Sequence, residues 1–578
     1  MYKRQLPRTP AEWQPAVIGS RAVAGALELS DSEATACCDA MHAVCGVHTL
    51  TLTLHRSATT QHASEAKADE LRACTAVASL STLRTLKLSQ YTADSFRPVW
   101  SLLLALTRLT QLEELEVHWH EYDGAAAQHL SAFPPPVCLP TTLTRLHLGI
   151  TVGNDRFRED VGKLVSGLTC LSRLADLTLF GTVAADEALL TLVLGYLTTL
   201  TALDLGRDNL DDDGAEALAP ALGRLLRLAD LRLDWNGISP FGAAALAPAL
   251  GHLAALTRLE LSGNRLFASG AEALAPALGR LSRLAALTLQ CNGLRAAGAA
   301  ALASPIAPLT TLTLLDLGEN SLGAIGAEAL APALGHLSRL AHLDLTDNGL
   351  GAGGAAALAT PVALLTALTT LRIWGNDIGA DGTEALAPAL SRLSRLASLS
   401  LRQSGIGAAG AAALAAPVAL LTALTALDIS CNNIGADSTE ALAPALSRLS
   451  RLATLSLSQN DTGAAGAAAL APALGRLTAL TQLDLCDNEL GADGAEALAP
   501  ALGRLTALTQ LDLSYNSIGD EGLPQLAPAL ARLTGLKSLG LNGNAPDSAE
   551  DALRARLPAS VWEATDLHHR RLRAARDA

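Results

Sequence analysis

The sequence is poor in aromatic residues, which make up 3% of its 578 positions, and it contains two methionines. Nevertheless, 49% of the residues are hydrophobic, so leucine and alanine supply most of the apolar mass. A chain with so few large side chains is not expected to fill one large globular core. The composition instead predicts a core that is built in small, repeated portions.

Long uninterrupted apolar runs are also missing. The mean hydropathy is +0.28, but threonines interrupt the longest apolar stretch, residues 188–203. That stretch is shorter than the roughly 20 residues of a membrane-spanning helix, and no secretory signal is evident. We therefore expect no membrane partner and a cytoplasmic location.

The sequence has fewer basic than acidic residues: 42 Lys and Arg against 56 Asp and Glu, for a net charge of −14. This balance predicts no nucleic-acid partner. The nine cysteines are scattered and form no pair of CxxC motifs, which favours a reducing compartment over a disulfide framework or a zinc site. Neither a P-loop nor a nucleophile elbow occurs, so we expect no enzymatic activity and no cofactor.

The sequence is rich in copies of a 28-residue repeat. In the copy that starts at Leu200, L-x-x-L-x-L has strand periodicity, and GAEALAPAL has apolar residues at helix spacing. A strand with a crossover helix makes a parallel βα unit. Such a unit cannot bury its apolar face alone, so the copies must stack. Further copies start at Leu228, Leu256, Leu284, Leu312, Leu340, Leu368, Leu396, Leu424, Leu452, Leu480, Leu508 and Leu536.

Asparagine and proline recur in the copies. The asparagine after each strand is expected to bond backbone groups where the chain turns inward, so that stacked copies form a ladder that Ser404 interrupts. A proline in the helical half predicts short helices that break before it. The predicted ladder residues are Asn209, Asn236, Asn264, Asn292, Asn320, Asn348, Asn376, Asn432, Asn460, Asn488, Asn516 and Asn544.

A longer period underlies the repeat. Glutamate and alanine alternate from copy to copy, as at Glu216 and Ala244, so the array looks built from duplicated two-repeat blocks. Acids cluster near the expected helix starts and arginines near the helix ends. Both placements suit the helix dipole, and we interpret them as stabilising and solubilising.

The unit LxxLxLxxNxLGxxGAxALAxALxxL resembles the ribonuclease-inhibitor-like class of leucine-rich repeats. That class also occurs in NOD-like receptors and in Ran GTPase-activating proteins, and the GAxALA string is similar to GALA-type effectors, whose units are shorter. The resemblance implies an α/β leucine-rich-repeat solenoid, or horseshoe, with a parallel β-sheet on the concave face and short helices on the convex face. It weakens upstream, where strands are expected near Val47, Leu83, Leu112, Leu143 and Leu174.

Four segments are expected along the chain. Residues 1–46 are expected to form a helical N-terminal cap or the remnant of a lost domain, and residues 1–5, MYKRQ, look like a translated sequencing-adapter remnant. Irregular leucine-rich repeats occupy 47–199 and regular ones 200–544. Residues 545–578 are expected to supply a C-terminal cap helix, with Trp562 packing nearby, and a basic tail.

Outward strand positions should form columns across the sheet. The second half of the central column is largely acidic, and neighbouring carboxylates should repel each other unless a basic partner approaches. The structural alternative is a solvated column that keeps the chain hydrophilic. The column runs through Lys87, Glu116, His147, Thr178, Asp204, Arg232, Glu260, Thr288, Asp316, Asp344, Arg372, Ser400, Asp428, Ser456, Asp484 and Asp512.

Four aromatic residues, Trp119, Trp235, Trp374 and Tyr515, leave the strands on that side. Exposed aromatic side chains commonly anchor interfaces, whereas capping the strand edge is the structural alternative. The surroundings of Trp235 are the strongest hot-spot candidate, because three charged residues lie close by. The candidate partner-binding residues are Trp235, Arg232, Asp230, Arg258, Trp374, Arg372, Tyr515, Asp316, Asp344, Asp484 and Asp512.

One polar cluster resembles a weak metal site. Glu116, His118 and His147 combine imidazole and carboxylate groups that suit a divalent ion. Strand alternation spreads such groups apart, however, so a wet polar strand is the alternative and no metal is expected.

The sequence thus predicts a monomeric protein-interaction scaffold that binds a protein partner, including one with a basic surface, through its concave face. The resemblance leaves two alternatives. One is GTPase activation, although Ran GTPase activators typically have fewer repeats and an acidic tail. The other is the sensing half of a truncated NOD-like receptor or effector.

Overall fold

The computed structural model divides into two compact units. Unit 1 comprises Met1–Arg265 and Pro276–Arg283, and unit 2 comprises Leu266–Ala275 and Leu284–Ala578. In each unit, parallel strands alternate with helices, as expected from the α/β repeat. The structure describes residues 26–30, 49–55, 83–91, 106, 109–120, 139–151, 167–180, 187–544, 553 and 555–565.

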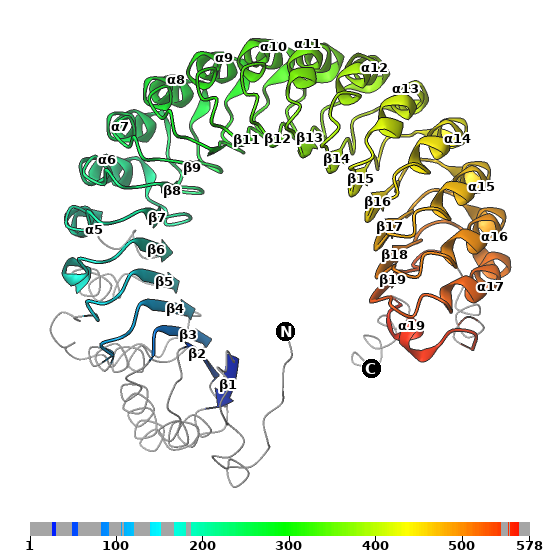
Figure 1. Cartoon of the computed structure of the whole chain (residues 1–578), viewed down its shortest axis with the longest axis horizontal. Helices are drawn as coiled ribbons and strands as arrows, with labels where there is room; N and C mark the ends of the chain where they lie inside the picture. Colours follow the sequence, from blue (N-terminus) through cyan, green and yellow to red (C-terminus); the bar gives the residue numbers. More distant parts are fainter. Residues whose placement is uncertain are drawn as a thin grey trace, which may run out of the picture. The chain divides into compact units, whose positions relative to one another are not determined.

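Unit 1 is built on parallel strands that pair in sequence order (Figure 1). The upstream strands begin close to the positions predicted for them. The strands are β1 Ala26–Ser30, β2 Thr49–His55, β3 Thr85–Tyr91, β4 Glu114–His120, β5 Arg145–Thr151, β6 Asp176–Phe180, β7 Ala202–Asp204, β8 Asp230–Arg232 and β9 Arg258–Glu260. The helical segments are η5 Leu168–Cys170, α5 Glu187–Leu194, α6 Asp211–Leu222 and α7 Pro240–Leu250, and α8 Phe267–Leu278 follows.

In unit 2, short parallel strands line the inner side of an arc and helices form its outer side (Figure 1). The strands are β10 Ala286–Thr288, β11 Leu314–Asp316, β12 His342–Asp344, β13 Thr370–Arg372, β14 Ser398–Ser400, β15 Ala426–Asp428, β16 Thr454–Ser456, β17 Gln482–Asp484, β18 Gln510–Asp512 and β19 Ser538–Gly540. The helices are α9 Arg295–Ile306, α10 Gly323–Leu334, α11 Gly351–Leu364, α12 Gly379–Leu390, α13 Gly407–Leu420, α14 Gly435–Leu446, α15 Gly463–Leu474, α16 Gly491–Leu502, α17 Gly519–Leu530 and α19 Ala559–Glu563.

Leucines at the inward strand positions form the core, which confirms the predicted strand alternation. Leu315, Leu343 and Leu371 occupy adjacent places on three neighbouring strands and are at most 1% exposed. The helices add buried leucines such as Leu330 and Leu358. Each repeat therefore completes the core of its neighbours rather than a core of its own.

The asparagine ladder is present, and Asn348 illustrates its geometry. Its amide nitrogen donates to the carbonyl groups of Leu317 at 2.9 Å and Leu345 at 2.9 Å. Its Oδ1 accepts the backbone amides of Asn320 at 3.1 Å and Leu322 at 3.3 Å, in the preceding repeat. Because Asn348 is 1% exposed, these bonds satisfy backbone groups that water does not reach.

Two positions depart from the regular geometry of the ladder. Asn209 was placed in it wrongly: that residue is exposed and has φ +53°, whereas the buried Asp208 takes the ladder position and donates its backbone amide to Asn236 Oδ1 at 2.9 Å. At Ser404, the expected interruption, the hydroxyl lies 3.3 Å from the Ile373 carbonyl and 3.1 Å from the Arg402 carbonyl. The serine thus replaces only part of what an asparagine provides.

The prediction that each helix breaks before its proline is wrong. Helix α10, for example, runs without interruption from Gly323 to Leu334 and contains Pro332. This proline lies near the end of the helix on its exposed side, and Glu328, four residues earlier, is exposed too. Water can therefore bond the carbonyl that the missing N–H leaves free, and the cost of the proline stays small.

The two terminal segments also had predictions to compare with the structure, and the N-terminal one differs at β1. Strand β1 pairs with β2, with Ala26 opposite Thr51, inside the segment expected to be a helical cap; ALELS has the strand alternation of the repeats. Most of the expected C-terminal cap helix lies outside the described residues, but Trp562 is 6% exposed on α19, and Thr565 bridges to Leu539.

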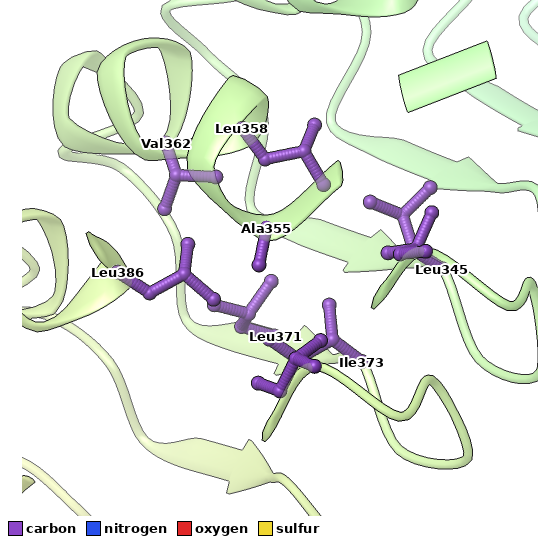
Figure 2. A pocket seen from close by; sticks show the side chains of 9 residues that line it. Leu345, Ala355, Leu358, Val362, Leu371, Ile373 and Leu386 are labelled. Carbon is purple, nitrogen blue, oxygen red and sulfur yellow. The ribbon is translucent and has the colours of Figure 1, made fainter. Parts of the chain in front are cut away.

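The core of unit 2 contains a small void between two consecutive repeats (Figure 2). Its volume is about 10 Å³, which is close to the space of a single water molecule. A wholly apolar wall offers such a water no hydrogen bond, so the void is a packing gap and not a ligand site. It is lined by Leu345, Leu350, Ala355, Leu358, Val362, Leu371, Ile373, Ile378 and Leu386.

Within the described parts of the chain, no helix is both long enough and apolar enough to cross a membrane. The four-segment division of the chain stays a prediction, since the boundary between the two units falls inside the regular repeats at residues 265–284.

Candidate binding surface

The outward strand positions of unit 1 form the predicted column. The register places Lys87 beside Glu116 and Glu116 beside His147, and it continues from Asp204 to Arg232. Residues of opposite charge are neighbours at several steps of this column. The outward face of unit 1 is therefore a network of side chains whose charges can compensate one another.

Arg232 lies at the centre of this network, where it contacts three carboxylates. Its guanidinium lies 3.5 Å from Asp230, 3.9 Å from Glu260 and 4.0 Å from Asp204. Burial acts to lower the pKa of Arg232, but the three carboxylates outweigh it and raise that pKa. Arg258 adds contacts of 3.3 Å to both Asp230 and Glu260. The structure thus brings together the three charged residues expected around Trp235.

Trp235 follows this network and remains 52% exposed. Its backbone is left-handed, with φ +57°, and its indole lies over Gly263 of the next repeat, where an added Cβ would collide with the ring. Gly263 itself has φ +66°, so glycine is required there on both grounds. One face of the indole is thus supported by backbone while the residue stays accessible.

The weak metal candidates also lie together, but their geometry does not favour a metal. The Glu116 carboxylate contacts the Lys87 ammonium and lies 2.9 Å from His118 Nε2. Burial acts to raise the pKa of Glu116, and the bonds from Lys87 and His118 lower it overall. A lysine on the carboxylate competes with any cation. Among the described residues, no three His, Cys, Asp or Glu side chains are grouped to hold a metal ion.

His147 packs against His118, with ring centroids 4.7 Å apart and planes inclined by 56°. Burial, followed by the nearby His118, lowers the pKa of His147. The two rings add to the polar patch on these strands. The side chains of Trp119 and His120 lie outside the described residues.

In unit 2 the predicted column has the expected register, with Asp316 beside Asp344 and Asp484 beside Asp512. Each aspartate also has a local structural role that the sequence analysis missed. Asp316 Oδ1 accepts the backbone amide of Gly318 at 3.0 Å, and Asp344, Asp428, Asp484 and Asp512 accept the amide two residues on in the same way. This Asx turn ends the strand, so these carboxylates serve the backbone as well as the surface.

Negative potential is nevertheless evident along this column. Burial, together with the neighbouring Asp344, raises the pKa of Asp316 to about 6. Arg372 opposes this effect and lies 3.4 Å from Asp344. Further along, burial and the carboxylates of Asp512 and Asp484 raise the pKa of the Cys486 thiol to about 12. At both places burial is the larger cause, and the neighbouring carboxylates add to it.

The aromatic residues of unit 2 are not equivalent. Tyr515 is 61% exposed, has φ +56°, and lies over Gly543 as Trp235 lies over Gly263. Trp374 is half-buried and stands one position earlier in its repeat, so it belongs to a different column.

A column of left-handed residues directly before the ladder positions was missed by the sequence analysis. It includes Trp235 and Tyr515, and its polar members bond along the array: Cys431 Sγ to Gln459 Oε1 at 2.8 Å, and Gln459 Nε2 to Asp487 Oδ2 at 3.2 Å. The glycines that recur at this position were the available signal, because a positive φ favours glycine.

Eight segments match the model of the Leucine Rich repeat family: residues 196–219, 252–275, 309–331, 337–359, 365–387, 421–443, 477–499 and 505–527. These segments are leucine-rich repeats, and the strand-and-helix alternation is the α/β fold of such proteins. A search of the curated proteins finds no match.

Solved structures similar to this chain include an internalin from Listeria monocytogenes, at 25% identity, 55% coverage of this chain, 82% of that chain and a TM-score of 0.37. TLR13 in complex with ssRNA13 has 17% identity, coverages of 86% and 75%, and a TM-score of 0.41. The plant peptide hormone receptor RGFR1 in complex with RGF2 has 15% identity, coverages of 80% and 87%, and a TM-score of 0.35. With TM-scores below 0.5, these likenesses define neither the fold nor the function of the chain.

Proposed function

We propose that this protein is a binding scaffold that holds a protein partner on the outward face of its sheet. Leucine-rich repeats generally act in protein–protein interaction and are typically non-enzymatic, and stacked repeats offer an extended surface for this purpose. The proposal commits to the surroundings of Trp235 as the main contact site.

The observation that carries the proposal is the supported but accessible indole of Trp235. An aromatic side chain that is already fixed on its glycine platform loses little conformational freedom when a partner covers it. Arg232 in the same repeat and Arg258 in the next are held by Asp230 and Glu260, so their side chains too are restricted before binding. A central aromatic residue with a polar rim is the usual arrangement of an interface hot spot.

The acidic column of unit 2 is proposed as a second contact, for a basic part of the partner. Asp316 lies beside Asp344 and Asp484 beside Asp512, so a nearby cation would be attracted to two negative charges at each place. Trp374 with Arg372, and Tyr515, flank these acids as further contact residues. The same carboxylates also accept the backbone amides of the Asx turns that end their strands.

The test is affinity capture with the whole chain, followed by quantitative mass spectrometry. Wild type is compared with the double variant Trp235→Ala/Arg232→Ala, which should lose the captured proteins while its melting temperature falls by no more than a few degrees. The matched control is Phe241→Ala/Arg227→Ala, which removes an aromatic residue that is 82% exposed and an exposed arginine outside the strands.

Equal capture by wild type and the Trp235→Ala/Arg232→Ala variant would overturn the proposed site, and a large fall in its melting temperature would make the two residues structural. GTPase activation, the truncated-receptor alternative, the monomeric state and the cytoplasmic location stay predictions of the sequence.

A further inference from the structure

The helix ends of unit 2 carry a second surface that the sheet does not explain. The turns that follow α10 to α17 contain arginines and one lysine but no acidic residue. The arginines among them are exposed, and no ion pair within the described residues involves them. In a chain with net charge −14, this is a concentrated strip of uncompensated positive charge.

Stabilisation of the helix dipole, the role expected from the sequence, does not account for this strip. None of the helices α9 to α17 has a basic residue in its last turn. Arg392, for example, lies two residues beyond the end of α12 at Leu390 and Arg395 lies five beyond it. The dipole effect fades beyond the last turn of a helix, so the positions that matter most for it are not the ones that are basic.

Leucines occupy the same row as these arginines. Leu364, Arg392, Leu420 and Arg448 are each 28 residues apart and so take equivalent places in four consecutive repeats. Leu364 is 52% exposed and Leu420 is 55% exposed. Exposed leucine does nothing for solubility or for a helix dipole, so the alternation calls for another explanation.

The alternation follows from the two-repeat block. Helices α11 and α13 have 14 residues and end on the exposed leucine, whereas α12 and α14 have 12 and are followed by an arginine-rich turn. The 56-residue period seen in the sequence thus becomes a leucine–arginine alternation over the four repeats from Leu364 to Arg448.

We propose that the surface formed by Leu364, Arg392, Arg395, Leu420, Arg448 and Arg451, here called the leucine–arginine edge, binds a polypeptide segment in which acidic and apolar side chains alternate. The arginines supply charge for carboxylates, and the leucines supply apolar contacts that a nucleic-acid backbone would not use. This surface is separate from the outward face of the sheet.

The spacing suits an extended peptide. Adjacent repeats are about 4.8 Å apart where parallel strands pair and about 8–10 Å apart where helices pack, and the turns lie between the two. Side chains on one face of an extended chain recur every 6.6–6.8 Å or so. In a partner whose every second residue is alternately apolar and acidic, each of these side chains would therefore contact one repeat.

The test measures binding of a fluorescent peptide of Leu-Ser-Glu-Ser repeats to the full chain. Binding is detected by fluorescence anisotropy at about 50 mM salt, where exposed charges are weakly screened. The peptide should bind, and a peptide of the same composition with its glutamates gathered at one end should bind about tenfold more weakly. Leu364→Ser/Leu420→Ser and Arg392→Ala/Arg448→Ala should each weaken binding about tenfold, a difference of about 1.4 kcal/mol.

The matched control is Arg476→Ala/Arg504→Ala, which removes two arginines of the same strip beyond the alternating stretch, and it should weaken binding less than threefold. Circular dichroism is used to check that each variant is folded. The proposal is overturned if the alternating peptide fails to bind, if the leucine variant binds as wild type does, or if the control loses as much as the Arg392/Arg448 variant. Preferential binding of an oligothymidylate or of anionic vesicles would also overturn it, in favour of a nucleic-acid or a membrane surface.

Discussion

At the scale of single residues, polar side chains in this protein mostly serve the backbone. The ladder asparagines bond amides and carbonyls at the inward turn, and the strand-ending aspartates accept the amide two residues on. A buried backbone group without a partner costs about 1–3 kcal/mol, which explains why these positions vary so little from repeat to repeat. Ser404 is the informative exception, because its hydroxyl offers one donor where an asparagine offers two and a separate acceptor.

Ser404→Asn is therefore expected to stabilise the protein by about 1–2 kcal/mol, since the added amide can bond backbone groups of the adjoining turns. Chemical denaturation of wild type and variant measures the difference. The converse substitution, Asn348→Ser, should destabilise by a similar or larger amount. A neutral Ser404→Asn beside a destabilising Asn348→Ser would mean that the turn at residue 404 no longer has the ladder geometry.

At the scale of elements, the helices show that position decides what a proline costs. In α10, Pro332 stands two residues before the C-terminal end, where one hydrogen bond is lost and the exposed Glu328, four residues earlier, leaves its carbonyl open to water. Helix α10 remains continuous through Pro332 for this reason.

Pro332→Ala should accordingly change the free energy of unfolding by less than about 1 kcal/mol, because the regained hydrogen bond is offset by greater freedom of the unfolded chain. Glu328→Pro, which places a proline at the centre of the same helix, should cost about 3 kcal/mol. Thermal melts of both variants check the contrast. A substantial loss of stability in Pro332→Ala would show that the proline itself holds the helix end in place.

At the scale of the whole molecule, each unit has its own distribution of charge. The outward face of unit 1 compensates its charges through Arg232, Arg258 and their carboxylate neighbours. Unit 2 has a largely acidic column on its strands, in which Arg372 pairs with Asp344, and exposed arginines on its helix-end turns. The two kinds of surface suit different partners, since paired charges add specificity while unpaired ones add attraction.

Stability should likewise be local. Leu343→Ala removes a side chain that is 1% exposed and should cost about 2–5 kcal/mol. Because each repeat contacts chiefly its neighbours, hydrogen exchange should accelerate most in β11 to β13 and leave the strands of unit 1 at their wild-type rates. His342→Ala, at an exposed position of the same strand, is the control. Uniform acceleration along the chain would instead indicate one cooperative body.

The sequence by itself determined the repeat, the strand alternation and nearly every ladder position, because these depend on periods that a linear chain displays directly. Its one ladder error was Asn209. The residue type fits the ladder, but Asp208 holds the position 28 residues before Asn236. It also named Asp230, Arg232 and Arg258, which the structure joins in one network of ion pairs.

Only the tertiary structure decided which of these side chains are already engaged, and with what. The support of Trp235 by Gly263, the Asx turns of the aspartates and the continuous helices depend on contacts between repeats or on which side of an element faces water. Low aromatic content, the feature that first distinguished this sequence, acquires a physical reason at this level. Stacked repeats close their core with leucine and alanine, so the few aromatic residues that stay exposed, such as Trp235 and Tyr515, lie outside that core and remain accessible to a partner.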